Sequence, residues 1–102
     1  MKITKFGHCC LLIEEKGLRI LTDPGNYSTI DDELKNIDII LIPVSGTYVM
    51  TPEEACQAVK IIKPKIAIPM HYGAGVVGTD ADAEKFKDLA KQFCQVLVLS
   101  KV

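Results

Sequence analysis

The run IDIILIPV at residues 37–44 constrains the fold of this chain more than any other feature. It is almost continuously apolar and rich in β-branched residues, which is typical of a strand buried on both faces of a sheet. Such a strand needs helices over at least one face, and a helix start follows closely. Thr51 offers an N-cap, Pro52 a first helical position, and Glu54 the carboxylate of a capping box. The sequence therefore predicts a strand followed by a helix that packs on the sheet.

Weaker signals complete the order of elements. The stretches KITKF, CLLIEE and LRILT predict three earlier strands, and Lys16-Gly17 between the last two favours a tight hairpin. Residues 27–36 are predicted to be a loop with one short helical turn. A strand IAIP at residues 66–69 and a closing strand VLVL at residues 96–99 flank a second helix. One face of that helix carries Phe86, Leu89, Ala90 and Phe93. The predicted fold class is α/β (mixed α+β): a mixed β-sheet of about six strands, with its second half parallel, and two main helices.

Length, charge and cysteines narrow the class of protein. With 102 residues, we expect residues 1–102 to form one domain. The net charge of -1, with both signs interspersed, gives no basic face, so we expect neither nucleic-acid nor membrane binding. The opening MKITKFGH does not read as a signal peptide, and no apolar run could cross a membrane, which predicts a cytoplasmic protein. Four cysteines without a C-x-x-C pair predict reduced, mostly buried thiols.

Three side chains are candidate metal ligands. His71 directly follows a predicted strand and precedes a glycine-rich loop, where open α/β sheets bind their ligands. His8 lies in the turn after the first strand, and Asp23 lies at the exit of the third. Two imidazoles and one carboxylate can hold a metal and leave a position for water. Nothing in their spacing requires that they meet. Asp23 before Pro-Gly is equally ordinary turn chemistry, and His71 could simply be hydrogen-bonded at a strand end.

Other catalytic motifs give less support. No G-x-S-x-G nucleophile motif is present. The stretch GAGVVG at residues 73–78 matches the glycine pattern of dinucleotide-binding loops, but no acidic residue follows about 20 residues later. Nucleotide binding is therefore a weaker alternative, which predicts stabilisation by a nucleotide without any metal.

Four longer stretches resemble a known family. KITKFGHCCLLIE and LRILTDPG resemble the opening strands of metallo-beta-lactamase-fold, metal-dependent hydrolases, also known as zinc-dependent hydrolases. ILIPVSGTYVMTPEEA and KPKIAIPMHYG resemble the closing half of that family, so the resemblance covers nearly the whole chain. It implies a reduced metallo-beta-lactamase fold, with His71 as a late metal ligand and with His8 and Asp23 beside the metal. The implied cofactor is zinc or another divalent metal.

The chain departs from the family in one important respect. Members of the family are longer and carry a His-x-His-x-Asp-His motif that supplies most of their ligands, and this sequence has none. Our hypothesis is that the middle was deleted between two similar strands, of which residues 37–44 are the remaining copy. A hydrolytic zinc site needs about three protein ligands. Residual activity, no activity and no bound metal therefore all stay open, and the small-molecule substrate is unknown.

The same resemblance bears on assembly. A shortened sandwich would leave one apolar sheet face uncovered, and such faces rarely persist in a soluble monomer. We therefore expect a homodimer. The alternative function is a non-catalytic α/β domain that dimerises through the uncovered face.

Overall fold

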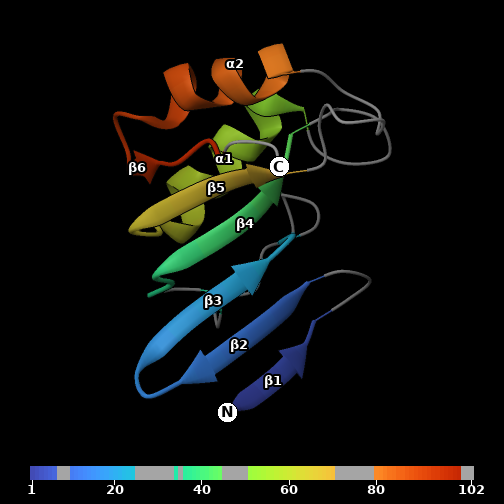
Figure 1. Cartoon of the computed structure of the whole chain (residues 1–102), viewed down its shortest axis with the longest axis vertical. Coiled ribbons are helices and arrows are strands. Elements are labelled where there is room, and N and C mark those ends of the chain that lie inside the picture. Colours follow the sequence, from blue (N-terminus) through green and yellow to red (C-terminus); the bar gives the residue numbers. More distant parts are fainter. Residues whose placement is uncertain (7–9, 25–33, 35, 45–50, 71–79, 100–102) are drawn as a thin grey trace.

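The computed structural model describes residues 1–6, 10–24, 34, 36–44, 51–70 and 80–99, with the side chain of residue 80 excepted. Six strands form one sheet in the order β1-β2-β3-β4-β5-β6 (Figure 1). The strands are β1 (Lys2–Lys5), β2 (Leu11–Glu15), β3 (Leu18–Thr22), β4 (Ile39–Pro43), β5 (Ile66–Met70) and β6 (Gln95–Val96), and the helices are α1 (Pro52–Ile62) and α2 (Asp80–Ala90). The predicted mixed sheet with two helices is confirmed. Most of the loop predicted at residues 27–36 lies outside the described residues.

The sheet changes from antiparallel to parallel at β3. Strands β1, β2 and β3 form an antiparallel meander, whereas β3, β4, β5 and β6 pair in parallel. The turn between β2 and β3 places Lys16 at φ 50° and Gly17 at φ 85°. Two successive residues with positive φ are the requirement of the type I′ hairpin turn, which glycine meets without steric cost. The predicted hairpin is confirmed.

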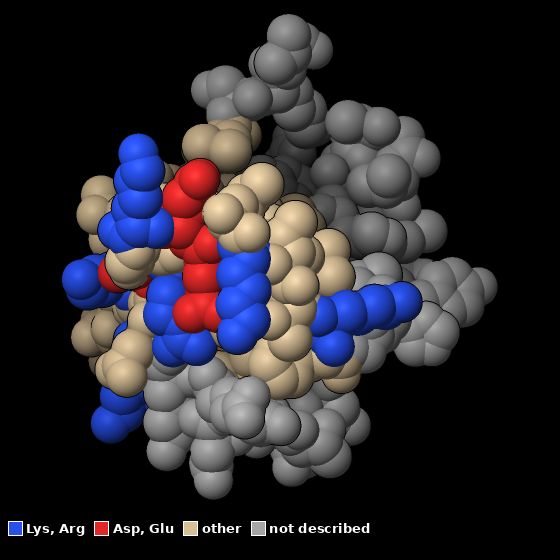
Figure 2. Space-filling model, turned by 90° about the horizontal axis from the view of Figure 1, so that it is seen from below, with Lys and Arg blue, Asp and Glu red and all other residues tan. Residues whose placement is uncertain are grey.

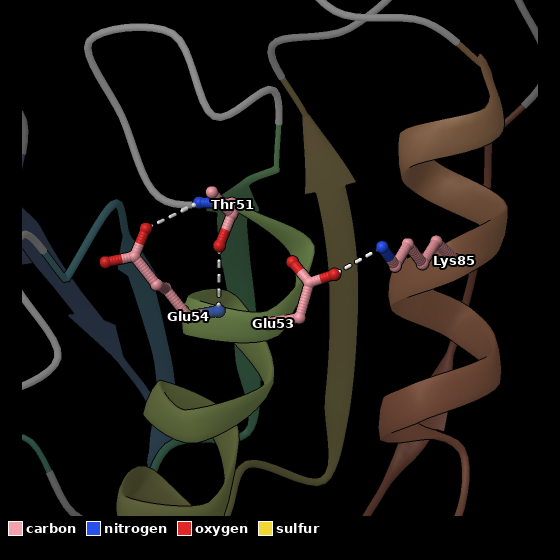
Figure 3. Close-up of polar contacts among 4 residues, drawn as sticks. All are labelled: Thr51, Glu53, Glu54 and Lys85. Carbon is pink, nitrogen blue, oxygen red and sulfur yellow. Dashed lines mark hydrogen bonds and ion pairs between the residues drawn. The ribbon is translucent and has the colours of Figure 1, made fainter.

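Helix α1 begins as its sequence predicts. The backbone N–H of Glu54 donates to Oγ1 of Thr51 at 3.2 Å, and the backbone N–H of Thr51 donates to Oε1 of Glu54 at 3.0 Å (Figure 3). This capping box satisfies two donors that the first turn would otherwise leave without partners. The helix ends at Ile62, and its C-cap, Lys63, adopts the left-handed conformation. An ion pair between Glu53 and Lys85 then joins α1 to α2 (Figure 3).

The C-terminal predictions need correction. Phe86 and Ala90 are buried and Leu89 is partly buried, but Phe93 is 43% exposed. The reason is that α2 ends at Ala90, and a closing turn follows in which the N–H of Phe93 donates to the carbonyl of Ala90. The predicted strand at residues 96–99 is also shorter, since β6 ends at Val96.

The two faces of the sheet have different surroundings. One row in register across β2 to β6 consists of Leu12, Leu21, Ile40, Ala67 and Val96, and all five are buried in one core with residues of both helices. We call this side the helix-covered face. In Figure 1, α1 lies behind β5, so the near side of the sheet in that view is the opposite one.

The opposite side, which we call the open face, carries a second row of five isoleucines: Ile3, Ile13, Ile20, Ile39 and Ile66. Ile3 is 58% exposed, and the other four are only partly buried. On this side of β4, Ile39 and Leu41 are only partly buried, whereas Pro43 is buried. The prediction that residues 37–44 are buried on both faces is therefore correct for the helix-covered face and for Pro43, but not for Ile39 and Leu41. Neither described helix, at 11 residues each, has the length and apolar character needed to span a membrane.

Candidate metal centre at the carboxyl edge of the sheet

The three predicted ligands follow strands that end at one edge of the sheet. Strand β1 leads into His8, β3 into Asp23 and β5 into His71. Because β2 runs antiparallel to both of its neighbours and β3, β4 and β5 are parallel, the ends of β1, β3, β4 and β5 share one edge (Figure 1). Open α/β sheets bind ligands beyond such carboxyl ends. We call this the carboxyl edge.

Asp23 is the one predicted ligand that the structure describes. Its backbone N–H donates to the carbonyl of Leu41 at 2.8 Å, which extends the pairing of β3 with β4 by one residue. Its φ is 38°, in the left-handed region. A residue before proline normally takes an extended conformation, and a non-glycine residue with positive φ is uncommon. The chain therefore turns sharply at Asp23, and its partly buried side chain lies at the carboxyl edge.

A side chain that the sequence analysis missed helps to form this edge. Oγ1 of Thr22 accepts a hydrogen bond from the backbone N–H of Leu11 at 3.1 Å, so the end of β3 is fastened to the start of β2. Beside β4, the N–H of Val44 donates to the carbonyl of Met70 at 3.2 Å, directly before His71. Thr22 gives no sequence signal, because its partner lies eleven residues away and the bond exists only in the paired sheet.

The two histidines, His8 and His71, lie outside the described residues, as does Cys9. Within the described part of the chain, no three histidine, cysteine, aspartate or glutamate side chains gather into a cluster that could hold a metal. The free thiols of Cys10 and Cys56 are buried and that of Cys94 is partly buried, as predicted. Burial raises the pKa of Cys56 and of Cys94, so these thiols stay protonated.

A shallow depression lies at the opposite edge, around the β2–β3 hairpin. Its lining includes Lys2, Glu14, Lys16 and Arg19, so both signs of charge are present. Glu14 and Arg19 are already paired with each other at 3.3 Å. The carboxyl ends of the parallel strands are at the far end of the sheet. This depression therefore offers no alternative to the carboxyl edge.

Comparison with known proteins identifies the relatives of this chain. The beta-lactamase superfamily domain matches residues 28–71. The UPF0173 metal-dependent hydrolase of Thermococcus onnurineus is 35% identical over 96 residues, which cover 89% of this chain and 42% of the relative. A protein of the same name from Carboxydothermus hydrogenoformans is 41% identical over 87 residues, covering 80% of this chain and 38% of the relative.

Solved structures agree with these matches. A metallo hydrolase from Ignicoccus hospitalis shares the fold with a TM-score of 0.69 at 20% identity, over 96% of this chain and 48% of its own. A candidate Zn-dependent hydrolase of the metallo-beta-lactamase superfamily from Thermotoga maritima aligns with a TM-score of 0.62 at 28% identity, over 74% of this chain and 44% of its own. This chain is a homologue of the metallo-beta-lactamase-fold, metal-dependent hydrolases. The predicted relationship is confirmed.

This hydrolase homologue spans less than half the length of the relatives it matches, 42% in the case of the Thermococcus protein. The residue types predicted as ligands, histidine and aspartate, both bind zinc, and the structure describes one of the three, Asp23. Strands β1 and β5 each lie two strands from β3, which is about 10 Å. Asp23 therefore follows the central strand of the three, midway between the strands that precede His8 and His71 in the sequence.

Proposed function

We propose that this chain binds a divalent metal at the carboxyl edge and acts as a metal-dependent hydrolase. Asp23 would provide the carboxylate ligand, with His71 and His8 as the imidazole ligands, and zinc would be the metal. The naming of its relatives as metal-dependent hydrolases supports this proposal. The observation that carries it is the backbone of Asp23, whose φ of 38° departs from what a residue before proline ordinarily adopts.

Backbone strain of this kind costs of order 1–3 kcal/mol and is concentrated at binding and catalytic sites. The conformation is unusual at this position because Pro24 follows, and a residue before proline ordinarily takes an extended backbone. At Asp23 the strained conformation ends β3 abruptly and leaves the carboxylate at the carboxyl edge, midway between the strands that lead into both histidines. We infer that the conformation is kept because it holds the carboxylate in place for the metal.

A metal in this site would supply Lewis acidity and lower the pKa of a coordinated water to about 7. The role of the protein side chains is to fix the metal and to leave one position open to solvent. Hydrolysis of an ester or phosphodiester is the class of reaction that follows. We further propose that the protein works in the cytoplasm, where free thiols such as Cys10 and Cys56 remain reduced.

The decisive variant is Asp23→Asn. Asparagine tolerates the left-handed conformation as well as aspartate does, so the turn should survive while the charged ligand is lost. The matched control is Asp88→Asn, because Asp88 is an exposed aspartate on α2 whose carboxylate lies 3.7 Å from Lys91. Each protein would be stripped with a chelator, given zinc or manganese, and assayed with a chromogenic phosphodiester and a chromogenic carboxylic ester.

We expect the wild type and Asp88→Asn to regain metal-dependent hydrolysis, and Asp23→Asn to need at least about tenfold more metal for half-maximal activity, in line with the usual loss on disturbing a metal site. Circular dichroism should show all three proteins equally folded. Equal metal requirements in Asp23→Asn and the wild type would refute the role of Asp23. Absence of hydrolysis in every protein, with no bound metal, would refute the function.

A further inference from the structure

Within the described residues, the open face is apolar at its centre, between β2 and β5, and carries Lys5, Glu15 and Gln95 at its margins. Beside the row of five isoleucines lies a neighbouring row, in register across β2, β4 and β5, formed by Leu11, Leu41 and Ile68, with Thr22 between them on β3. All four are partly exposed. Leu18, at the start of β3, is 44% exposed on the same face. No charged residue interrupts these two rows between β2 and β5.

The size of this surface is that of an interface. Five strands spaced about 4.8 Å apart, with about 3.3 Å per residue along each, give the open face a flat footprint of about 400 Å². Exposed apolar patches of several hundred Å² on a soluble protein usually mark an interaction site. The accessible area is larger than the footprint because the side chains project from it. Two such footprints together come to about 800 Å², which is the size of a weak, reversible interface and predicts a dimer that dissociates on dilution.

Both edges of the sheet are protected against pairing with another sheet. The β1 edge carries the exposed lysines Lys2 and Lys5, and Figure 2, seen from the β1 side, shows lysine, arginine and acidic side chains gathered there. Charged side chains, lysine above all, discourage strand addition at an edge. The β6 edge is only two residues long. Association through the open face is therefore favoured over association through an edge.

We propose that the open face binds the open face of a second copy of this chain, so that two sheets pack in a β-sandwich. A two-fold axis would place the isoleucine and leucine rows of one copy against the same rows of the other. An isologous interface requires such contact between identical surfaces. Sheets pack face to face at about 10 Å, with interdigitating apolar side chains. A net charge of -1 leaves almost no repulsion between two copies.

The first test is the mass of the 102-residue protein in solution. Sedimentation equilibrium across about a hundredfold range of concentration should fit a monomer–dimer equilibrium. The key variant is Ile39→Lys, which places a charge at the centre of the open face, and it should be monomeric throughout. The matched control is Ile61→Lys, which makes the same change at an isoleucine of α1 that is 46% exposed. This control should dimerise like the wild type.

A second measurement does not depend on any variant. A mixed sample of the wild type, with isoleucine methyl groups labelled in one half of the molecules only, should show contacts between Ile20 or Ile39 methyls of different copies by isotope-filtered nuclear Overhauser spectroscopy. A strictly monomeric wild type would overturn the proposal and would leave the face to a different polypeptide. A dimer without these methyl contacts would overturn the proposal. So would a dimer that persists in Ile39→Lys but is lost in Ile61→Lys, because the interface would then lie on the helices.

Discussion

The two faces of the sheet are built from the same strands and nearly the same kinds of residue, yet they differ in burial. Leu12, Leu21 and Ile40 on the helix-covered face are at most 3% exposed. Ile13, Ile20 and Ile39, each one position away, are only partly buried. Because successive side chains in a strand point to opposite sides, a one-residue step changes the surroundings completely. Apolar residues along a strand therefore show that a face can be buried against another surface, but they do not show which surface covers it.

Two adjacent isoleucines of β4 should differ strongly in how much free energy of unfolding is lost when each is replaced by alanine. Ile40→Ala removes a side chain that is 0% exposed, and losses of about 2–5 kcal/mol are usual for such a cavity. Ile39→Ala should cost less than half as much, because Ile39 is partly exposed and leaves no closed cavity. Urea unfolding at low protein concentration, where any dimer is dissociated, would measure both. Equal losses would contradict the difference between the two faces.

A smaller effect is expected at the start of α1, the helix that covers one face. Thr51→Ala removes the hydroxyl that accepts from the N–H of Glu54, and loss of such a cap costs about 1 kcal/mol. Thr51→Ser keeps the hydroxyl and should retain most of the stability. Thermal unfolding of the two variants beside the wild type is the measurement. If alanine and serine were equally tolerated, the stability of the covered face would not depend on this cap.

The smallest effect is electrostatic and independent of both faces. Oδ2 of Asp38 accepts from the backbone N–H of Arg19 at 2.8 Å, and Oδ1 lies 3.2 Å from Nζ of Lys65. The hydrogen bond from Arg19, followed by that from Lys65, holds the pKa of Asp38 below its ordinary value. Since the folded-state pKa is the lower one, the stabilisation is fully present above the ordinary carboxyl pKa and is lost as the pH falls through the folded pKa.

Below about pH 4, therefore, the wild type should lose stability more steeply than Asp38→Asn does. The measurement is the urea midpoint at successive pH values between about 2 and 6. Asp88→Asn, altered at an exposed position on α2, should follow the wild type. Parallel curves for Asp38→Asn and the wild type would show that this carboxylate does not link the strands as the contacts indicate.

Local chemistry made much of the fold predictable. The cap at Thr51, the hairpin at Lys16-Gly17 and the apolar run of β4 each act within a few residues, so their patterns survive in the sequence. The end of α2 was predicted too late because Phe93 continues the helical spacing of apolar residues past Ala90. The apolar residues keep their helical intervals in the sequence up to Phe93, although the backbone has already left the helix after Ala90.

The candidate site was predictable only in part. Strand order puts the residues before His8, Asp23 and His71 at one edge, and the sequence allows that order to be inferred. The backbone angle of Asp23 and the bond from Leu11 to Thr22 arise from pairing between distant segments, which leaves no local signature. The uncovered sheet face was predicted from the family resemblance and not from the strands themselves, because an apolar strand has the same pattern whether it faces a helix, another sheet or solvent.

The most direct test of the metal centre is the metal content of the purified, tag-free protein, measured by elemental analysis beside His71→Ala. We expect close to one zinc or other divalent ion per chain in the wild type and its loss in the variant, with both proteins equally folded. No metal in either protein, or the same content in both, would contradict a metal centre at the carboxyl edge.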